Sequence, residues 1–318
     1  MKYKAIGLIG PTATGKTELA LKLANIYPLE IISVDSILIY KDMNIGSSKP
    51  SNQDLEVVPH HLINILLPTE TYSVASFLND SVKLIKEINL KNKIPLLVGG
   101  TMMYFNALIN GISKLPTANE EIRQQIIMDA QKNGWDYVYN KLIELDDLAA
   151  TRITPNDHQR IIRALEVYYL TGKPISQMQI QDKINIAKDI NFVNFSIIPA
   201  DRKILHQIIN QRFITMLNNG LINEVEQLRL KYNTLTNMHT AIKSVGYYQV
   251  WNFLDGIISY DEMVAQAQAA TRQLAKRQTT WLNSMNSITN IANDNLLEID
   301  KLFLQLTSKL NASAELNM

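Results

Sequence analysis

Apolar runs and amphipathic stretches alternate along the first hundred residues. Three runs have the length and the continuous apolar character of strands buried on both faces: 3–10, 29–36 and 94–101. Two stretches with helical spacing of their apolar residues separate them: 14–27 and 72–92. This order predicts an α/β fold with a parallel sheet flanked by helices.

The pattern changes near Pro116, and from there to Lys173 it is almost wholly helical. Asn156 or Asp157 can cap a helix over 158–170, and Gly172 is placed to end it. A return strand and three further helices follow: 191–200, 201–219, 221–232 and 262–285. We therefore expect a catalytic core formed by 1–115 and 190–318, with a mostly helical insertion over 116–189.

Composition narrows the function classes. The chain has 318 residues, 46% of them hydrophobic, no cysteine and a formal net charge of +1. Any contact with nucleic acid must come from a local basic face, because there is no global excess of charge. There is neither a signal-peptide pattern nor a run of about 18 apolar residues, so we expect a cytoplasmic protein without a membrane span. We also expect a monomer.

A phosphate-loop motif follows the first predicted strand. Residues 10–17 match G-x-x-x-x-G-K-[ST] between a strand and a helix, the context this motif requires: Gly10, Pro11, Thr12, Ala13, Thr14, Gly15, Lys16 and Thr17. Successive backbone N–H groups make such a loop a concave anion site, and the lysine adds charge. The Thr17 hydroxyl is a candidate Mg²⁺ ligand. The sequence thus predicts a site for a phosphate group.

The partners expected for ATP hydrolysis are missing. The third strand ends in Gly99, Gly100 and Thr101, where a carboxylate would be needed to hold the nucleotide's metal. Asp35 instead ends the second strand, and the carboxyl ends of parallel strands face the ligand. We interpret Asp35 as a base that activates an acceptor. The alternative is an indirect Mg²⁺ ligand or a helix cap.

Six segments occur in the order seen in tRNA dimethylallyltransferases, and the sequence resembles this family from about Ile6 to Leu282. They are "GPTATGKT", "VDSILIYKDMNIGSSKP", "PHHLINI", "LLVGGTMMYFNALINGI", "NDHQRIIRALEVYYLTGK" and "ATRQLAKRQTTWL". The resemblance implies a core like that of P-loop nucleoside triphosphatases. It also implies a loop that holds the diphosphate of dimethylallyl diphosphate rather than ATP.

The same resemblance implies the reaction and its partners. The enzyme would transfer the dimethylallyl group to N6 of the adenosine directly 3′ of the anticodon, in tRNAs that read codons beginning with U. Mg²⁺ would be required, and the insertion would bind the anticodon stem-loop. The adenine would have to be flipped out of the stacked loop to reach the site.

The resemblance also assigns residues. Asp35 corresponds to the general base, and Thr101 to the family threonine at the reaction centre. Three residues continue the segment that lines the adenine: Ser36, Ile37 and Leu38. Arg123 and one further segment correspond to tRNA contacts: Gln159, Arg160, Ile161, Ile162 and Arg163. Tyr248 stands where the family has an arginine, which weakens a basic contact there.

Some assignments stay open. Tyr40 and Tyr104 are candidates to stack on the adenine, and the sequence does not choose between them. A basic set in the last predicted helix is either an RNA-binding stripe or a polar helix face: Arg272, Lys276 and Arg277. Three rival functions share parts of the pattern: a phosphate-loop kinase, a prenyltransferase acting on free AMP or ADP, and a non-catalytic RNA-binding protein.

Overall fold

The structure is a computed structural model that describes residues 3–181, 183–199, 201–285 and 288–292. The chain divides into two compact units. We call Met1–Ile109 with Ile186–Met318 the sheet unit, and Asn110–Asn185 the helical unit. The sequence division placed the insertion at 116–189. The helical unit begins and ends a few residues earlier than this prediction. It includes an antiparallel strand pair at its two ends, β5 (Ile112–Ser113) and β6 (Lys183–Ile184). The final segment assigned to the core, 293–318, lies outside the described residues.

The sheet unit contains a parallel six-stranded sheet in the order β3-β2-β4-β1-β7-β8. Its strands are β1 (Tyr3–Ile9), β2 (Leu29–Val34), β3 (His60–His61), β4 (Ile94–Gly99), β7 (Ile190–Ile198) and β8 (Ile288–Ala292). The buried central strands explain the continuous apolar runs in the sequence. The predicted α/β fold with a parallel sheet is confirmed, and the short edge strands β3 and β8 are additions to it.

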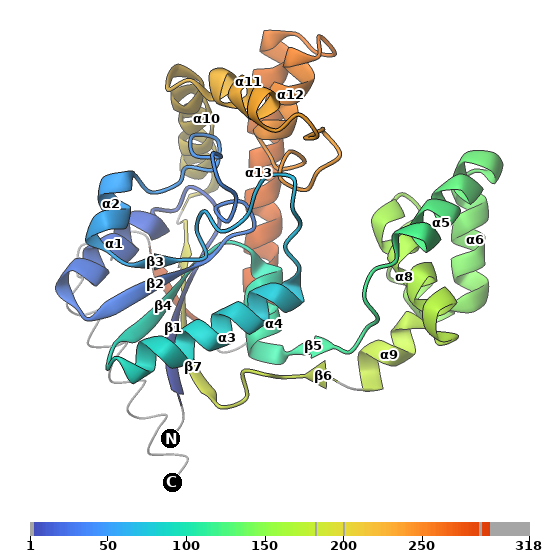
Figure 1. The fold of residues 1–318 in the computed structure, drawn as a ribbon, viewed down its shortest axis with the longest axis horizontal. Coiled ribbons are helices and arrows are strands. Elements are labelled where there is room, and N and C mark those ends of the chain that lie inside the picture. The colour runs from blue at the N-terminus through green and yellow to red at the C-terminus, as the bar shows by residue number, and fades with distance from the viewer. Residues whose placement is uncertain (1–2, 182, 200, 286–287, 293–318) are drawn as a thin grey trace. The chain divides into compact units, whose positions relative to one another are not determined.

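Helices cover the sheet. The helix α1 (Lys16–Ile26) buries Leu19, Ala20 and Leu23 in one apolar cluster with residues of β1, β2, β4 and β7. The helix α3 (Val74–Leu90) lies against β1, β2 and β4 and crosses the sheet in Figure 1. Two shorter helices complete this part: α2 (Asn52–Val57) and α4 (Met102–Asn110). The central strands are therefore shielded from water.

Four later helices fix the segment that follows β2. They are α10 (Arg202–Asn218), α11 (Leu221–Lys231), α12 (Tyr247–Leu254) and α13 (Tyr260–Ser284). In Figure 1 the first three lie beyond the ends of the strands, and α13 runs from there down to the level of α4. Their cluster includes Ile39, Tyr40 and Met43 from the post-β2 segment. The Glu224 carboxylate also accepts hydrogen bonds from the backbone N–H groups of residues 44–46. The chain after Asp35 is thus anchored by residues far away in sequence.

The helical unit contains α5 (Glu120–Asn133), α6 (Trp135–Leu145), α7 (Asp147–Ala150), α8 (His158–Thr171) and α9 (Ile175–Gln181). Asp157 caps α8 through the N–H of Arg160, and Gly172 ends it in the left-handed conformation. Both ends match the sequence prediction.

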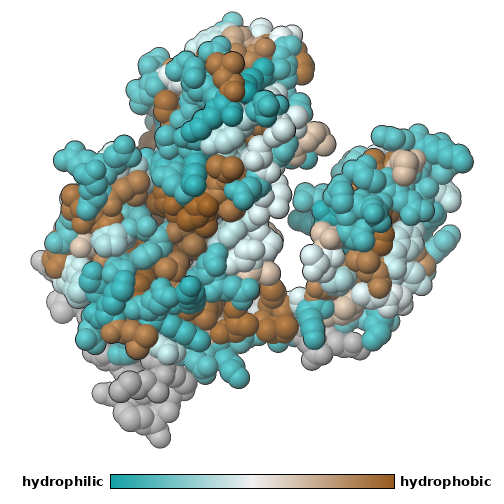
Figure 2. Space-filling view, in the orientation of Figure 1, coloured by the Kyte–Doolittle hydropathy of each residue, from teal (hydrophilic) through white to brown (hydrophobic). Residues whose placement is uncertain are grey.

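The face of this unit seen in Figure 2 is mainly hydrophilic. No helix in the described ranges is long and apolar enough to cross a membrane.

A buried carboxylate organises the helical unit. Glu166 has no exposed surface, and it accepts hydrogen bonds from the guanidinium groups of Arg123 and Arg163 and from the N–H of Asn119. Arg163 also donates to the Pro116 carbonyl at 2.7 Å. Burial opposes ionisation of Glu166, but the hydrogen bonds from Arg123, Arg163 and Asn119 outweigh it and lower the pKa. This network fastens the start of the unit and α5 to α8.

Glu166→Ala should therefore weaken the helical unit. We expect the free energy of unfolding of this unit to fall by about 2–3 kcal/mol. Breaking a fully buried ion pair costs about 3–5 kcal/mol, and the effect here is smaller because both arginines keep contact with water. Hydrogen exchange of the α8 amides in the full-length protein measures this local stability. The matched control is Glu144→Ala, which removes an exposed carboxylate from α6. Equal protection in the two variants would contradict the anchoring role.

Candidate active site

The phosphate loop joins β1 to α1 and has the geometry of an anion site. Ala13 and Gly15 adopt left-handed backbone conformations, with φ of 65° and 80°. A side chain at Gly10 would place a Cβ 2.8 Å from the Ile197 carbonyl oxygen, so the loop needs glycine there. The Thr14 hydroxyl donates to the Pro11 carbonyl at 2.9 Å and closes the loop on itself. The backbone thus forms a preorganised cradle at the N-terminus of α1.

Lys16 lies inside this cradle. Its side chain is buried, and its ammonium donates to the Pro11 carbonyl and, at 3.4 Å, to the Thr14 hydroxyl. Burial, helped by the positive charge of Arg212, lowers the pKa of Lys16 to about 7, although Asp35 acts in the opposite direction. No carboxylate among the described residues forms an ion pair with this ammonium, and a bound phosphate group would supply the compensating charge.

Arg212 is a second cation at the same cavity, and the sequence analysis missed it. It projects from α10, where Nε donates to the Ser48 hydroxyl at 2.9 Å and a terminal nitrogen lies 3.5 Å from the Thr12 hydroxyl. Burial lowers its pKa, while the Asp35 charge raises it. No local motif marks this arginine, because only the packing of α10 brings it to a loop two hundred positions earlier.

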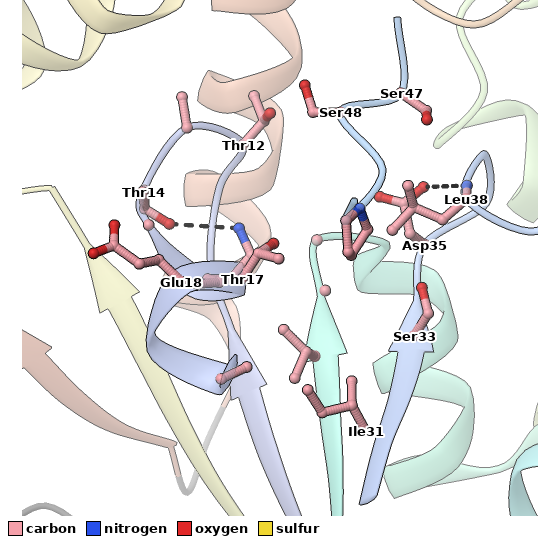
Figure 3. Close-up of a pocket in the computed structure, with 18 of the residues that line it drawn as sticks. Thr12, Thr14, Thr17, Glu18, Ile31, Ser33, Asp35, Leu38, Ser47 and Ser48 are labelled. Atoms are coloured by element: carbon pink, nitrogen blue, oxygen red, sulfur yellow. Dashed lines mark hydrogen bonds between the residues drawn. The ribbon is translucent and has the colours of Figure 1, made fainter. Parts of the chain in front are cut away.

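Asp35 lies across the cavity from the loop (Figure 3). Its Oδ1 accepts hydrogen bonds from the N–H groups of Ile37 and Leu38, at 2.8 and 3.2 Å. The neighbouring Ser36 N–H donates to the Thr101 hydroxyl at 3.1 Å. One carboxylate oxygen therefore caps a turn, and no helix begins at Asp35, so the residue is not the helix cap named as an alternative. Among the described residues no hydrogen bond occupies Oδ2, so the carboxylate keeps an oxygen for a ligand.

The cavity between these groups has a volume of about 360 Å³. In Figure 3, the loop residues Thr12, Thr14 and Thr17 line one side, and Ser33, Asp35 and Leu38 line the other. Part of its lining is apolar: Ala20, Ile31 and Val98. A cationic wall beside an apolar surface suits a phosphorylated compound with a small apolar group.

The oxygen atoms at this cavity also suit Mg²⁺. The Thr17 hydroxyl and the Asp35 carboxylate both line it, and hard oxygen ligands are the ones this ion prefers. The described ranges contain no group of three acidic or histidine side chains that could hold a metal. Protein atoms alone therefore build no complete metal site here, and an ion would need phosphate oxygens as further ligands.

The chain is similar to known proteins over most of its length. The family model described as IPP transferase matches residues 38–285. The chain belongs to the IPP transferase family. A curated relative, the tRNA dimethylallyltransferase of Chromobacterium violaceum, is 47% identical over 285 residues, which is 90% of this chain and 87% of that protein.

Solved structures of IPP transferases share the fold. The full-length tRNA isopentenylpyrophosphate transferase of Bacillus halodurans has a TM-score of 0.72 at 32% identity, with 99% of both chains covered. A eukaryotic dimethylallyltransferase described as acting on tRNA has a TM-score of 0.73 at 28% identity, covering 92% of this chain and 74% of that one.

The segment predicted to contact tRNA, residues 159–163, lies on α8, and its side chains point partly to solvent and partly into the core of the helical unit. Gln159 and Arg160 are exposed, although Arg160 pairs with Asp157 at 2.7 Å. Ile162 is partly buried, and the side chain of Ile161 is fully buried in the core of the helical unit. The exposed side chains of the segment thus lie on the face of α8 that does not pack against the neighbouring helices, and a contact of the segment with tRNA stays a prediction.

Two arginines predicted to contact tRNA are engaged within the helical unit. The guanidinium groups of Arg123 and Arg163 hydrogen-bond the buried Glu166, although both side chains keep some exposed surface. An RNA phosphate could reach only the edge of each group that Glu166 leaves open. The structure thus gives both arginines a buried partner, Glu166, that the sequence pattern does not show.

Neither candidate stacking tyrosine is available to a base. Tyr40 is fully buried, and Tyr104 is 3% exposed and stacks on Phe77 with ring centroids 4.2 Å apart. Both belong to the core. In the basic stripe of α13, Arg272 donates to the Asn210 side chain at 2.7 Å, whereas Lys276 and Arg277 are exposed. The stripe therefore combines a packing contact with solvent-facing charge.

The low pKa of Lys16 gives a testable proton linkage. Binding of inorganic pyrophosphate should raise that pKa, so the protein should take up a proton as it binds at pH 8. Calorimetry in two buffers of different ionisation enthalpy measures the uptake. Lys16→Arg is the matched control, because arginine is charged throughout this range. Uptake should be larger in the native protein by most of one proton, and equal uptake would contradict the assignment.

Proposed function

We propose that this chain is a tRNA dimethylallyltransferase. It transfers the dimethylallyl group of dimethylallyl diphosphate to N6 of the adenosine directly 3′ of the anticodon, in tRNAs that read codons beginning with U. Diphosphate is the second product. The observation that carries the proposal is one cavity that combines a phosphate loop, an apolar lining and Asp35, with no carboxylate at the end of β4. The names of the relatives support the same activity.

The donor's diphosphate belongs on the phosphate loop. The loop amides, Lys16 and Arg212 would surround it and neutralise the charge that develops as the allylic carbon–oxygen bond breaks. A Mg²⁺ held by Thr17 and the diphosphate would add further charge neutralisation. The five-carbon group would then lie against the apolar side chains of Ala20, Ile31 and Val98.

The acceptor belongs on the side of Asp35. The exocyclic amine of adenine is a weak nucleophile, because its lone pair is delocalised into the ring. As the new bond forms between N6 and the allylic carbon, a proton leaves N6, and the unoccupied Oδ2 of Asp35 would accept it. Bond formation, diphosphate departure and proton transfer then balance without any other reactant.

Thr101 acts through the turn in this account. Its hydroxyl accepts the Ser36 N–H, so it holds the backbone next to the base. The sequence analysis assigned Thr101 to the reaction centre. The proposal gives it the role of orienting Asp35 there, together with the Ile37 and Leu38 amides that cap Oδ1. A base held by its own neighbours loses little freedom when the substrate binds.

The helical unit is proposed to bind the anticodon stem-loop. Its exposed α8 residues Gln159 and Arg160 are the members of the predicted segment best placed to meet RNA. Contacts of this kind to phosphates position the RNA and carry little base information. The adenine would be flipped out of the loop stack, which costs a few kcal/mol.

Mapping the product tests the activity. Purified protein, Mg²⁺, dimethylallyl diphosphate and an unmodified tRNA that reads a U-initial codon should give one prenylated nucleoside, at the adenosine 3′ of the anticodon. The same tRNA with guanosine at that position is the matched control and should stay unmodified. Prenylation elsewhere, or of the control, would contradict the proposed acceptor.

Asp35→Asn tests the base. The amide keeps an oxygen for the Ile37 and Leu38 N–H groups, so the turn should survive while the basic group is lost. Single-turnover transfer should fall by about 10²–10⁴-fold, with tRNA affinity changed far less. Asp35→Ala, which also removes the cap, separates the two effects. Transfer by the asparagine variant within a few-fold of the native rate would make Asp35 a structural residue.

A further inference from the structure

The side chain of Gln278 links the phosphate loop to the end of β4. Its Oε1 accepts the Thr12 N–H at 2.9 Å, and its Nε2 donates to the Gly100 carbonyl at 2.9 Å. One partner can only donate and the other can only accept, so the two contacts fix the orientation of the amide. Both ends of this partly buried side chain are therefore used to join two segments of the sheet unit.

The backbone at Gly100 leaves room for this contact. A Cβ at Gly100 would lie 2.6 Å from Nε2 of Gln278 and 3.0 Å from the carbonyl oxygen of Gly10. The Gly10 N–H also donates to the Gly99 carbonyl at 3.3 Å. The second glycine of the G-G-T segment thus lets α13 and the loop approach the same point.

The connection made by Gln278 continues from Gly100 through Thr101 to the turn that carries Asp35. Thr101 follows Gly100, and its hydroxyl accepts the Ser36 N–H beside Asp35. Its own N–H donates to the Val34 carbonyl at the end of β2, at 3.2 Å. A contiguous path of hydrogen bonds and peptide bonds therefore runs from Thr12 on the loop, through Gln278, to Asp35.

The hydrogen bond from the Thr12 N–H to Gln278 also affects which loop amides can bind a ligand. Backbone N–H groups of a phosphate loop are normally donors to the ligand. This one is taken by Gln278, which leaves diphosphate binding to the later amides of the loop, Lys16 and Arg212. Gln278 thus fixes the position of the phosphate loop, while the groups that bind the diphosphate are other ones.

We propose that Gln278 is a positioning residue that fixes the separation between the phosphate loop and the Asp35 turn. The inference rests on the proposed function, because only a transfer between two substrates needs that separation. The leaving diphosphate and the attacking amine must lie on opposite sides of one carbon atom. A displacement of about 1 Å can lower such a rate by about 10²-fold.

The test compares Gln278→Met with Gln273→Met. The first variant keeps the volume and removes both hydrogen bonds, and the second makes the same change at an exposed position one turn and a half earlier on α13. Single-turnover prenyl transfer is measured with both substrates saturating, and calorimetry gives the Kd for inorganic pyrophosphate. Thermal unfolding reports the stability of each variant.

We expect the transfer rate of Gln278→Met to fall by about 10–100-fold, with its pyrophosphate Kd within about threefold of the native value. Gln273→Met should match the native protein in both. Gln278→Asn keeps the amide but is one carbon too short to reach both partners. Its transfer rate should fall by a similar factor. If Gln278→Met is too unstable to assay, Gln278→Asn replaces it in the test.

Three results would overturn the role. The first is a native rate in both Gln278 variants, whatever their stability. The second is a weakened pyrophosphate Kd with an unchanged rate at saturation, which would make Gln278 a residue of ligand affinity. In both cases the native protein still transfers the prenyl group. The third is absence of transfer by the native protein itself, which would refute the proposed function together with this inference.

Discussion

A buried lysine and a half-buried arginine at one cavity govern the arrangement of the sheet unit. Lys16 is buried at the N-terminus of α1, and Arg212 reaches the same cavity from α10. Neither forms an ion pair with a carboxylate in the part of the chain that the structure describes, and burial lowers the pKa of both. Isolated buried charge is unfavourable, so the site is arranged for an anion that arrives with the substrate.

The remaining features of the site follow from the need to place that anion beside a base. The sheet brings the ends of β1, β2 and β4 together, which puts the phosphate loop, Asp35 and Thr101 on one edge. The C-terminal helices then fix the loops from outside, through Gln278 on the phosphate loop and through Glu224 on the segment after Asp35. The fold thus controls the distance between leaving group and acceptor more tightly than either loop could alone.

What the sequence predicted is mostly local. The order strand, glycine loop and helix is decided within some twenty residues, so the phosphate loop, its neighbouring strands and the caps of α8 follow from the pattern. Arg212 and Gln278 could not be predicted this way, since packing of α10 and α13 alone brings them to the loop. The position of Asp35 at the end of a parallel strand already indicated a base, whereas the role of Thr101 came from the resemblance alone.

The helical unit shows what a local sequence pattern leaves out. The resemblance grouped Ile161 with the segment expected to contact tRNA, and the structure buries its side chain in the core of the helical unit. Glu166 is a charged residue on a buried face, so its pairing with Arg123 and Arg163 was not visible in a pattern that treats charge as exposed. Charge pairs inside a helical unit need three-dimensional information.

We propose that the phosphate loop holds a prenyl diphosphate and not a nucleoside triphosphate. The most direct measurement supplies the purified protein, Mg²⁺ and unmodified tRNA with either dimethylallyl diphosphate labelled in the prenyl group or γ-labelled ATP, and asks which label moves. We expect only the prenyl label to reach the tRNA. Transfer of the γ-phosphate, with none of the prenyl group, would contradict it and identify the cavity as an ordinary nucleotide site.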